Sequence, residues 1–301
     1  MSQFYEKLTT TIPELEIRLD EPMSRHTTFR IGGPADYFVC PDREQIAEVF
    51  RIAHTYEIPV TVIGNGSNLL VGDKGIRGLV VEIGSAMNQI TVENNHIIAE
   101  AGALLSKVAA KAASEELGGM EFAAGIPGSI GGAVTMNAGA YGGEMKDILS
   151  KVTVLTDDGE IQTLDVSEMD LSYRHSCVPE NHYIVLEAEI VLERKPEAEI
   201  REQMEELRKK RVEKQPLEYP SAGSTFKRPE GYFAGKLIMD AGLRGYTVGD
   251  AQVSEKHCGF VINRKNASAA QVCQLMQDVQ DKVEKQFGVR LEPEVKMLGE
   301  F

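Results

Sequence analysis

The sequence predicts an α+β protein built from three parts, and two observations lead to this fold class. Helix and strand patterns alternate over the first third of the chain, whereas hairpin and long-strand patterns follow from about residue 150. A highly charged helix then leads into a smaller mixed region. Because 301 residues can form two or three modest domains, we expect parts at 1–84, 85–198 and 199–301.

The first third carries one clear helix and several strands. Apolar residues recur at helical spacing over 42–58, with Asp42 as a plausible N-cap. The residues on this apolar face are Ile46, Val49, Phe50 and Ala53. We expect strands within 59–71, 75–84 and 96–102, then a helix over 106–119 that begins at Ser106.

The rest of the chain reads as a hairpin, long strands and three helices. A hairpin is expected over 151–165 through Asp158-Gly159, and a strand over 183–193. The charged stretch near 197–213 predicts a solvated helix that ends close to a proline. A shorter helix and a strand follow, in YFAGKLIMDAGL and GFVINRK. Ser268 and Gly288 delimit a strongly amphipathic helix, and a last strand is expected over 289–298.

Composition excludes several classes of function. A formal net charge of -14 argues against a nucleic-acid surface. No run of about 18 apolar residues occurs and the N-terminal stretch lacks an apolar core, so we expect neither a membrane span nor a signal peptide. The four cysteines are scattered without metal spacing, so we expect no metal. We expect a cytoplasmic protein; the sequence does not set its oligomeric state, although we favour a monomer.

Two glycine-rich stretches carry the strongest functional signal. VIGNGSNLLV follows a strand directly, and AAGIPGSIGGAVTMNAGAYGGE spans 123–144. Glycines let backbone amides approach a pyrophosphate, and Ser and Asn add uncharged donors. Neither stretch matches the Rossmann, P-loop or nucleophile-elbow fingerprints. The composition therefore suits an uncharged cradle for a large dinucleotide such as FAD.

A third stretch, YPSAGSTFKRP at 219–229, places Ser224 on a short turn between prolines. On its residues alone this serine could be a nucleophile, a phosphate contact, a proton donor or part of a simple turn. A nucleophile needs an adjacent base, and no triad pattern accompanies any of the six histidines.

These motifs together resemble the UDP-N-acetylenolpyruvoylglucosamine reductase (MurB) family. The resemblance runs from about residue 20 to 298 and includes HTTFRIGGPADYFV, the two glycine-rich stretches, SYRHS, AGSTF and LEPEVKMLG. It implies two FAD-binding subdomains of the vanillyl-alcohol-oxidase (PCMH) type, followed by a smaller α+β substrate domain whose last strand returns to the active site. The segment after SYRHS is short, so the chain resembles the subtype without a tyrosine-clamp insertion.

The resemblance also implies the reaction and the residues that perform it. NADPH would reduce non-covalently bound FAD, and the hydride would pass from N5 to C3 of an enolpyruvyl ether of UDP-N-acetylglucosamine. The expected roles are a proton donor to C2 for Ser224, a cation at the substrate carboxylate for Arg174, and a contact at the carboxylate end for Glu294. Arginine suits this place because its fork binds carboxylate oxygens in pairs and keeps its charge.

The same resemblance assigns the binding residues. Those expected to hold FAD are Gly64, Asn65, Gly66, Ser67, Asn68, Gly125, Pro127, Gly128, Ser129, Gly131, Gly132 and Asn137. Those expected to contact substrate are Tyr173, Lys214, Lys227 and Arg228.

Two other functions remain open at this point. One is an oxidase of the same flavin superfamily, and the other is a non-catalytic protein that binds FAD or a nucleotide sugar. The glycine-rich stretches contain no His or Cys for a covalent flavin link, and a pure binder needs none of the three reacting residues.

Overall fold

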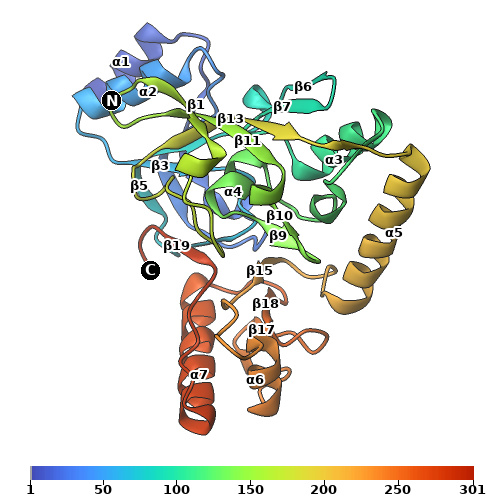
Figure 1. Ribbon diagram of the computed structural model, residues 1–301. Helices are drawn as coiled ribbons and strands as arrows, with labels where there is room; N and C mark the ends of the chain where they lie inside the picture. The colour runs from blue at the N-terminus through green and yellow to red at the C-terminus, as the bar shows by residue number, and fades with distance from the viewer. Residues whose placement is uncertain (1) are drawn as a thin grey trace. The chain divides into compact units, whose positions relative to one another are not determined.

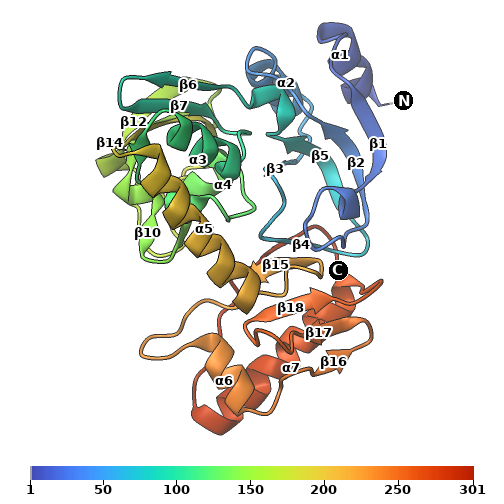
Figure 2. The ribbon, with the colours of Figure 1, turned by 90° about the vertical axis from the view of Figure 1, so that its right-hand side faces the viewer.

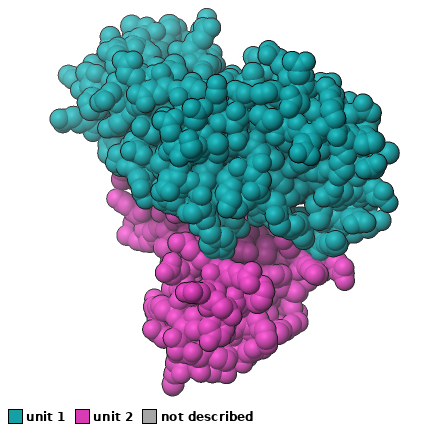
Figure 3. Space-filling model, viewed as in Figure 1, with its two compact units in different colours: residues 1–18, 38–65, 78–211 teal, residues 19–37, 66–77, 212–301 magenta. Residues whose placement is uncertain are grey.

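The computed structural model describes residues 2–301 (Figures 1 and 2). The chain divides into two compact units (Figure 3). Unit 1 comprises residues 1–18, 38–65 and 78–211, and unit 2 comprises residues 19–37, 66–77 and 212–301. Each unit is therefore assembled from three separate stretches of the chain. The boundaries at 84 and 198 stay a prediction.

Unit 1 contains a five-stranded antiparallel sheet in the order β12-β11-β13-β7-β6. Its strands are β6 (Ile90–Glu93), β7 (His96–Glu100), β11 (Leu149–Leu155), β12 (Ile161–Asp165) and β13 (Ile184–Val191). The predicted hairpin is confirmed, because β11 and β12 pair and Gly159 turns between them at a φ of 83°. The predicted strand over 183–193 is confirmed as β13.

A parallel pair of strands, β3 (Val60–Ile63) and β5 (Ile76–Glu82), forms a second part of unit 1, to which β5 belongs from Gly78 onward. Helices α1 (Gln3–Thr11) and α2 (Ile46–Thr55) pack on each other, and Phe4 contacts Tyr56 edge to face. The prediction that Asp42 caps α2 is wrong by three residues, because its carboxylate accepts from Glu44 and Gln45 in the turn before the helix.

The segments that follow carry the second glycine-rich stretch. Helix α3 (Leu105–Ser114) begins before Ser106, so the prediction that Ser106 starts the helix is wrong. Short helix α4 (Ile130–Thr135) lies within the stretch, and the remaining elements of unit 1 are small. They are β8 (Leu117–Gly118), β9 (Gly139–Ala140), β10 (Gly143–Glu144), β14 (Glu193–Arg194), η2 (Ser85–Met87), η3 (Glu121–Ala123), η4 (Met145–Asp147) and η5 (Val166–Glu168).

The charged helix is α5 (Glu197–Lys214), and its solvated character is confirmed. Ile200 is its one buried residue, and most of its surface is lined by charged side chains. Arg201 pairs with Glu197 and Arg208 pairs with Glu205, at i,i+4 and i,i+3 spacing.

Unit 2 packs two helices against a four-stranded antiparallel sheet in the order β15-β18-β17-β16. The strands are β15 (Ser221–Ser224), β16 (Thr247–Val248), β17 (Ala251–Val253) and β18 (Phe260–Asn263), and the helices are α6 (Ala234–Asp240) and α7 (Ala269–Phe287). The predicted ends of α7 are confirmed, since Ser268 forms a capping box and Gly288 closes the helix at a φ of 70°.

The core of unit 2 also contains residues from early in the chain. Phe29, Ile31 and Leu70 pack with the apolar faces of α6, α7 and the sheet. Strand β4 (Leu69–Val71) pairs in parallel with β19 (Lys296–Leu298), and the carboxylate of Asp73 accepts from the first amides of α7. The predicted strand over 289–298 is thus confirmed only in its last three residues.

The remaining elements lie near the N-terminus, and β1 and β2 each cross from one unit to the other along the chain. They are β1 (Ile17–Pro22), η1 (Met23–Arg25) and β2 (Pro34–Val39). Within residues 2–301, no helix is both long and apolar enough to cross a membrane.

Candidate functional site

A cavity of about 260 Å³ opens in unit 1 where strands β3 and β5 end. It is lined mainly by small and polar residues, with the aliphatic side chains of Ile83 and Leu104, and it contains one cation, Lys107 of α3, and one carboxylate, Glu82. The lining residues are Gly64, Asn65, Glu82, Ile83, Gly84, Ser85, Asn88, Gly102, Leu104, Lys107 and Ser129. Since pockets for drug-sized ligands are typically 300–1,000 Å³, this cavity can enclose only part of a dinucleotide.

The two glycine-rich stretches meet at this cavity. The Asn65 side-chain amide donates to the carbonyl of Pro127 at 2.7 Å. A methyl group added at Gly64 would lie 2.6 Å from the Ser129 Oγ, closer than any real Cβ contact. Glycine at 64 therefore leaves room for the Ser129 hydroxyl, which would have to rotate away from a larger residue.

Ser129 is the buried group that most directly indicates a ligand. Its side chain is 2% exposed, and among the described residues its hydroxyl has no hydrogen-bond partner. Buried hydroxyls are rarely left unsatisfied, and this one lines the cavity. The site therefore fits a ligand that offers hydrogen-bonding oxygens, and the uncharged donors around it suit the phosphate or hydroxyl groups of a dinucleotide.

Not every predicted cradle residue faces the cavity. The amide of Gly131 donates to Ala101 at 2.8 Å, so it is occupied within the protein. Gly131 also lets the segment approach Ala101 closely, since an added methyl would lie 3.0 Å from the Ala101 Cβ. Gly125, Pro127 and Gly132 are exposed, and the carbonyl of Gly128 accepts from Leu105 at 3.0 Å.

Asn137 departs most from our expectation that it contacts the cofactor. It is fully buried, and its side chain bonds to Glu144 at 2.8 Å, the Ser172 carbonyl at 3.1 Å and the Lys146 amide at 2.9 Å. Its side chain is thus committed to contacts inside unit 1. The placement suits a residue that positions the turn beginning at Ser172, and its contact with the cofactor stays a prediction.

Gly66, Ser67 and Asn68 belong to unit 2. Gly66 has a φ of 60°, and a methyl group there would collide with the carbonyl of His26, so only glycine fits. The Asn68 side-chain amide donates to the carbonyl of Glu294 at 3.1 Å, whereas the carbonyl of Asn68 accepts from Lys296. Asn68 therefore holds the segment that carries Glu294; Ser67 is half-buried.

Ser224 and Glu294, which lie 70 residues apart in the sequence, come from neighbouring segments of unit 2. The amide of Glu294 donates to the carbonyl of Thr225 at 2.9 Å, and the amide of Lys227 donates to Glu292 at 2.8 Å. Ser224 ends β15 and pairs with Phe260 of β18. Both Ser224 and Glu294 are half-buried.

Gly223, which has no side chain, leaves open space next to Ser224. Its φ is 73°, and nothing lies within 4 Å of where a side chain would begin. A ligand can therefore approach the backbone here without meeting a Cβ.

Arg174 lies in unit 1 on a tight turn between Ser172 and His175, whose backbones exchange two hydrogen bonds of 3.2 Å. Arg174 has a φ of 57°, which costs a non-glycine residue about 1–2 kcal/mol. Its guanidinium carbon lies 5.1 Å from the centre of the Tyr173 ring. Strain of this kind persists only where surrounding contacts hold it.

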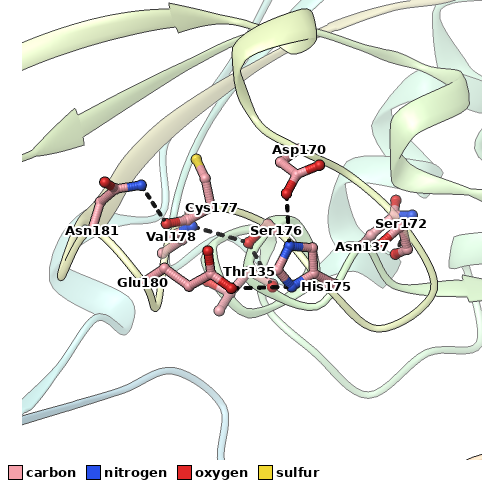
Figure 4. A network of polar contacts seen from close by, with 10 residues as sticks. All are labelled: Thr135, Asn137, Asp170, Ser172, His175, Ser176, Cys177, Val178, Glu180 and Asn181. Carbon is pink, nitrogen blue, oxygen red and sulfur yellow. Dashed lines mark hydrogen bonds and ion pairs between the residues drawn. The ribbon is translucent and has the colours of Figure 1, made fainter.

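Those contacts are visible in Figure 4. The Ser176 hydroxyl donates to the Thr135 carbonyl at 2.7 Å, and His175 bonds to Asp170 at 3.1 Å. Together with Asn137 bonded to Ser172, they hold both ends of the Arg174 turn. Thr135 ends α4, so the turn is attached to the second glycine-rich stretch.

The predicted substrate-binding residues lie in exposed positions. Lys227 forms an exposed ion pair with Glu292 at 3.3 Å, and the Arg228 guanidinium lies 4.0 Å from the centre of the Phe233 ring. Lys214 ends α5 and is exposed, as is Tyr173.

Sequence reasoning missed two groups in these surroundings. Lys107 was assigned to a helix without a role, because nothing in the spacing of α3 shows that its polar face borders a cavity. His257 lies next to the β15 edge, where its ring accepts from Gly259 at 3.1 Å, and burial lowers its pKa, with a smaller contribution from Lys214. Nothing in the sequence around His257 indicates that its ring is partly buried.

Comparison with known proteins gives consistent results over the whole chain. A family model described as an FAD binding domain matches residues 34–165, and one described as the C-terminal domain of UDP-N-acetylenolpyruvoylglucosamine reductase matches residues 215–298. A protein with that reductase name from Agathobacter rectalis is 64% identical over 310 residues, which cover 99% of this chain and 99% of the relative. Another, from Caldanaerobacter subterraneus, is 53% identical over 296 residues, with 98% of each covered.

A solved structure agrees with these relatives. The crystal structure of the reductase MurB from Thermus caldophilus superposes with a TM-score of 0.81 at 35% identity, covering 95% of this chain and 99% of that one.

Proposed function

The chain belongs to the UDP-N-acetylenolpyruvoylglucosamine reductase family, and we propose that Arg174, Ser224 and Glu294 perform its reaction. It is an FAD-dependent oxidoreductase of peptidoglycan synthesis that uses NADPH to reduce the enolpyruvyl ether of UDP-N-acetylglucosamine. Identity of 64% along 99% of the chain carries this conclusion.

FAD fits the cavity of unit 1 on the chemistry of its lining residues. When bound, FAD supplies the hydride chemistry that links NADPH to the substrate. We propose that Gly64, Asn65 and Ser129 contact it with the backbone and uncharged donors, and that Lys107 offers a cation to its pyrophosphate. The unsatisfied Ser129 hydroxyl supports this assignment.

Arg174 is proposed to bind the substrate carboxylate and to stabilise the negative charge that develops beside it. A guanidinium binds two carboxylate oxygens at once and stays charged at any working pH. The contacts made by Asn137 and Ser176 fix the turn in advance, so little reorganisation is needed when charge develops.

Ser224 is proposed to donate the proton to C2. A hydroxyl is a weak acid, but it is competent opposite a carbanion-like carbon, which is a strong base. Gly223 leaves the space through which a ligand reaches it.

Glu294 is proposed to contact the carboxylate end of the substrate. Its backbone is fixed by bonds to Thr225 and Asn68, so the side chain has a defined origin. The remaining proposed substrate contacts are Tyr173, Lys214, Lys227 and Arg228.

We further propose that the enzyme acts in the cytoplasm as a monomer, on small-molecule substrates alone. NADPH and a nucleotide sugar are the ligands this reaction requires. Sedimentation of the purified protein would test the monomer, and a second, concentration-dependent species would contradict it.

One anaerobic experiment tests the function. Purified protein is followed by visible absorbance while NADPH and then UDP-N-acetylglucosamine enolpyruvate are added. Flavin colour that bleaches with the first addition and returns with the second supports both halves of the reaction. A protein that bleaches but does not recover with this substrate would contradict the reductase, and reoxidation only by oxygen would indicate an oxidase.

A further inference from the structure

Helix α5 carries one arginine that differs from its other arginines. Arg201 and Arg208 each pair with a glutamate of the same helix at 2.6 Å, and both are largely exposed. Arg211 is partly buried, and within the part of the chain that the structure describes its guanidinium has neither an ion pair nor a hydrogen bond. Burial lowers the pKa of Arg211, although a guanidinium remains charged at neutral pH. The helix therefore holds a partly desolvated charge without a counter-charge.

The Arg211 side chain lies against the start of the second glycine-rich stretch. A methyl group added at Gly125 would lie 3.1 Å from the Arg211 Cδ and 3.5 Å from one of its terminal nitrogens. Gly125 itself is exposed, so the guanidinium borders a backbone that a ligand can reach. The neighbouring ionisable group is Tyr141, which is 47% exposed and carries no charge near neutral pH.

Burying an arginine without a counter-charge costs free energy, and a bound anion would offset this cost. Arginine forks bind phosphate oxygens bidentately, and such charge-assisted bonds are stronger in partly dry surroundings. No aspartate or glutamate among the described residues fills this role for Arg211, so the missing anion is expected to come from a ligand.

The location of Arg211 separates it from the FAD cavity. Arg211 is absent from the residues that line that cavity, whose own cation is Lys107. Gly125 lies four residues before Ser129 in the same stretch. Lys107 is therefore the cation proposed for the FAD pyrophosphate, and the FAD affinity of the Arg211 variants tests whether the anion at Arg211 belongs to another ligand.

We propose that Arg211 binds a phosphate group of a nucleotide co-substrate, either the diphosphate of the UDP-sugar or a phosphate of NADPH. This inference rests on the proposed function, because that function supplies the two phosphorylated ligands.

The test compares Arg211→Ala and Arg211→Lys with Arg208→Ala in the FAD-loaded enzyme. Arg208 is the matched control, since it lies one turn earlier on α5 and is exposed and paired with Glu205. UDP and NADP⁺ are titrated separately while the flavin absorbance is followed, and the FAD dissociation constant is measured on each apoprotein.

In Arg211→Ala, the affinity for UDP, for NADP⁺ or for both is expected to fall by about 10- to 100-fold, the loss typical of hydrogen bonds to a charged group. The nucleotide affinity of Arg211→Lys should lie between those of Arg211→Ala and the wild type, because lysine keeps the charge but cannot donate two parallel hydrogen bonds. If only UDP binding is weakened, the anion belongs to the sugar nucleotide. If only NADP⁺ binding is weakened, it belongs to the dinucleotide. If both are weakened, the two ligands share one phosphate position. Arg208→Ala should change neither by more than about twofold.

The proposal is overturned if Arg211→Ala binds UDP and NADP⁺ as tightly as Arg208→Ala does. It is also overturned if Arg211→Ala and Arg211→Lys weaken FAD alone, because the anion would then belong to the cofactor. Failure of the proposed function is distinguishable from both results, since the wild-type enzyme itself would then show no spectral response to UDP and no bleaching by NADPH.

Discussion

The backbone amide of Glu294 donates to the carbonyl of Thr225 at 2.9 Å, which places the Glu294 segment directly beside the end of β15. Ser224, the residue before Thr225, is the last residue of β15. The two proposed reacting groups of unit 2 therefore share one backbone scaffold, in which a shift of either segment moves the other.

Replacing Ser224 with alanine should abolish turnover but preserve the first half of the reaction. The variant should bind FAD and be bleached by NADPH, whereas reduction of the enolpyruvyl substrate should fall by about 10²- to 10⁴-fold because a proton donor is lost. Stopped-flow absorbance of both half-reactions checks this. Ser221→Ala, at the first residue of the same strand, is the control. An Ser224→Ala protein that fails to bleach would show that the assignment as proton donor is wrong.

Replacing Ser129 with alanine separates stability from cofactor affinity. The buried hydroxyl has no partner within the described chain, so its removal should not lower the melting temperature of the apoprotein. FAD should bind about 5- to 10-fold more weakly, because one hydrogen bond to the ligand is lost. Fluorescence titration with FAD and thermal unfolding measure the two quantities. Ser106→Ala, at an exposed position of α3, is the comparison; equal FAD affinity in both variants would contradict the cradle assignment.

The Gly64→Ala variant should be rescued in part by a second change at Ser129. Alone, the new methyl group would lie 2.6 Å from the Ser129 hydroxyl oxygen, so this hydroxyl must rotate or one segment must move. In the Ser129→Ala background that oxygen is absent and the clash is relieved. A double-mutant cycle in denaturant should give a coupling of about 1–3 kcal/mol. Strictly additive losses would mean that the two stretches are further apart than in the structure.

Removing Asn137 should loosen the turn that presents Arg174. Asn137→Ala leaves several buried groups without partners, so we expect the free energy of unfolding to fall by about 2–4 kcal/mol. The KM for the enolpyruvyl substrate should rise while bleaching by NADPH persists, because the carboxylate contact is misplaced. Asn95→Ala removes a single bond of 3.3 Å to Leu192 and serves as the control. If both variants unfold at the same denaturant concentration, Asn137 has no special positioning role.

Glu121 should give the fold a pH dependence on the acid side. Burial by itself raises the pKa of this 5%-exposed carboxyl, but hydrogen bonds from its own backbone, Lys195 and Gly119 outweigh burial and hold the pKa below its ordinary value. A carboxyl with a lowered folded pKa stabilises the fold above its unfolded pKa, and this stabilisation is lost as pH falls through the folded pKa.

The Glu121→Gln variant measures that contribution. It should melt at a lower temperature than the wild type at pH 7, and the difference should shrink as pH falls below about 4.3, the usual value for a glutamate. Glu115→Gln removes an exposed pair with Lys111 and should leave the melting temperature almost unchanged. A difference for Glu121→Gln that stays constant down to pH 3 would rule out a charge effect.

Local sequence signals predicted the elements whose ends have their own chemistry. Ser268 and Gly288 delimit α7 because a capping serine and a left-handed glycine satisfy the helix ends without help from other segments. The start of α3 was predicted wrongly at Ser106, because a serine is equally acceptable inside the first turn of a helix, where Ser106 lies. The strand expected over 289–298 shrank to three residues because its pairing depends on β4, more than 220 residues earlier.

For the candidate site, the sequence predicted the motifs but not how their residues lie relative to one another. Gly64 and Ser129 were both selected, but their close approach depends on tertiary packing that no local pattern encodes. Asn137 was assigned to the cofactor because it follows the glycines, and its bonds to Glu144, Ser172 and Lys146 depend on packing that the sequence does not show. Arg211 was grouped with the solvated face of α5, since nothing in the spacing of charges distinguishes a paired arginine from an unpaired one.

The division of each unit among three stretches of chain limits how such a protein can be rearranged. A gene fragment encoding only residues 212–301 would lack Phe29, Ile31 and Leu70, which fill the core of unit 2. It would also lack β4, the partner of β19, and Asp73, which caps α7. Recombination that exchanged the C-terminal third with that of a distant relative would therefore disturb a shared core. The two units are expected to be inherited together and to resist domain shuffling.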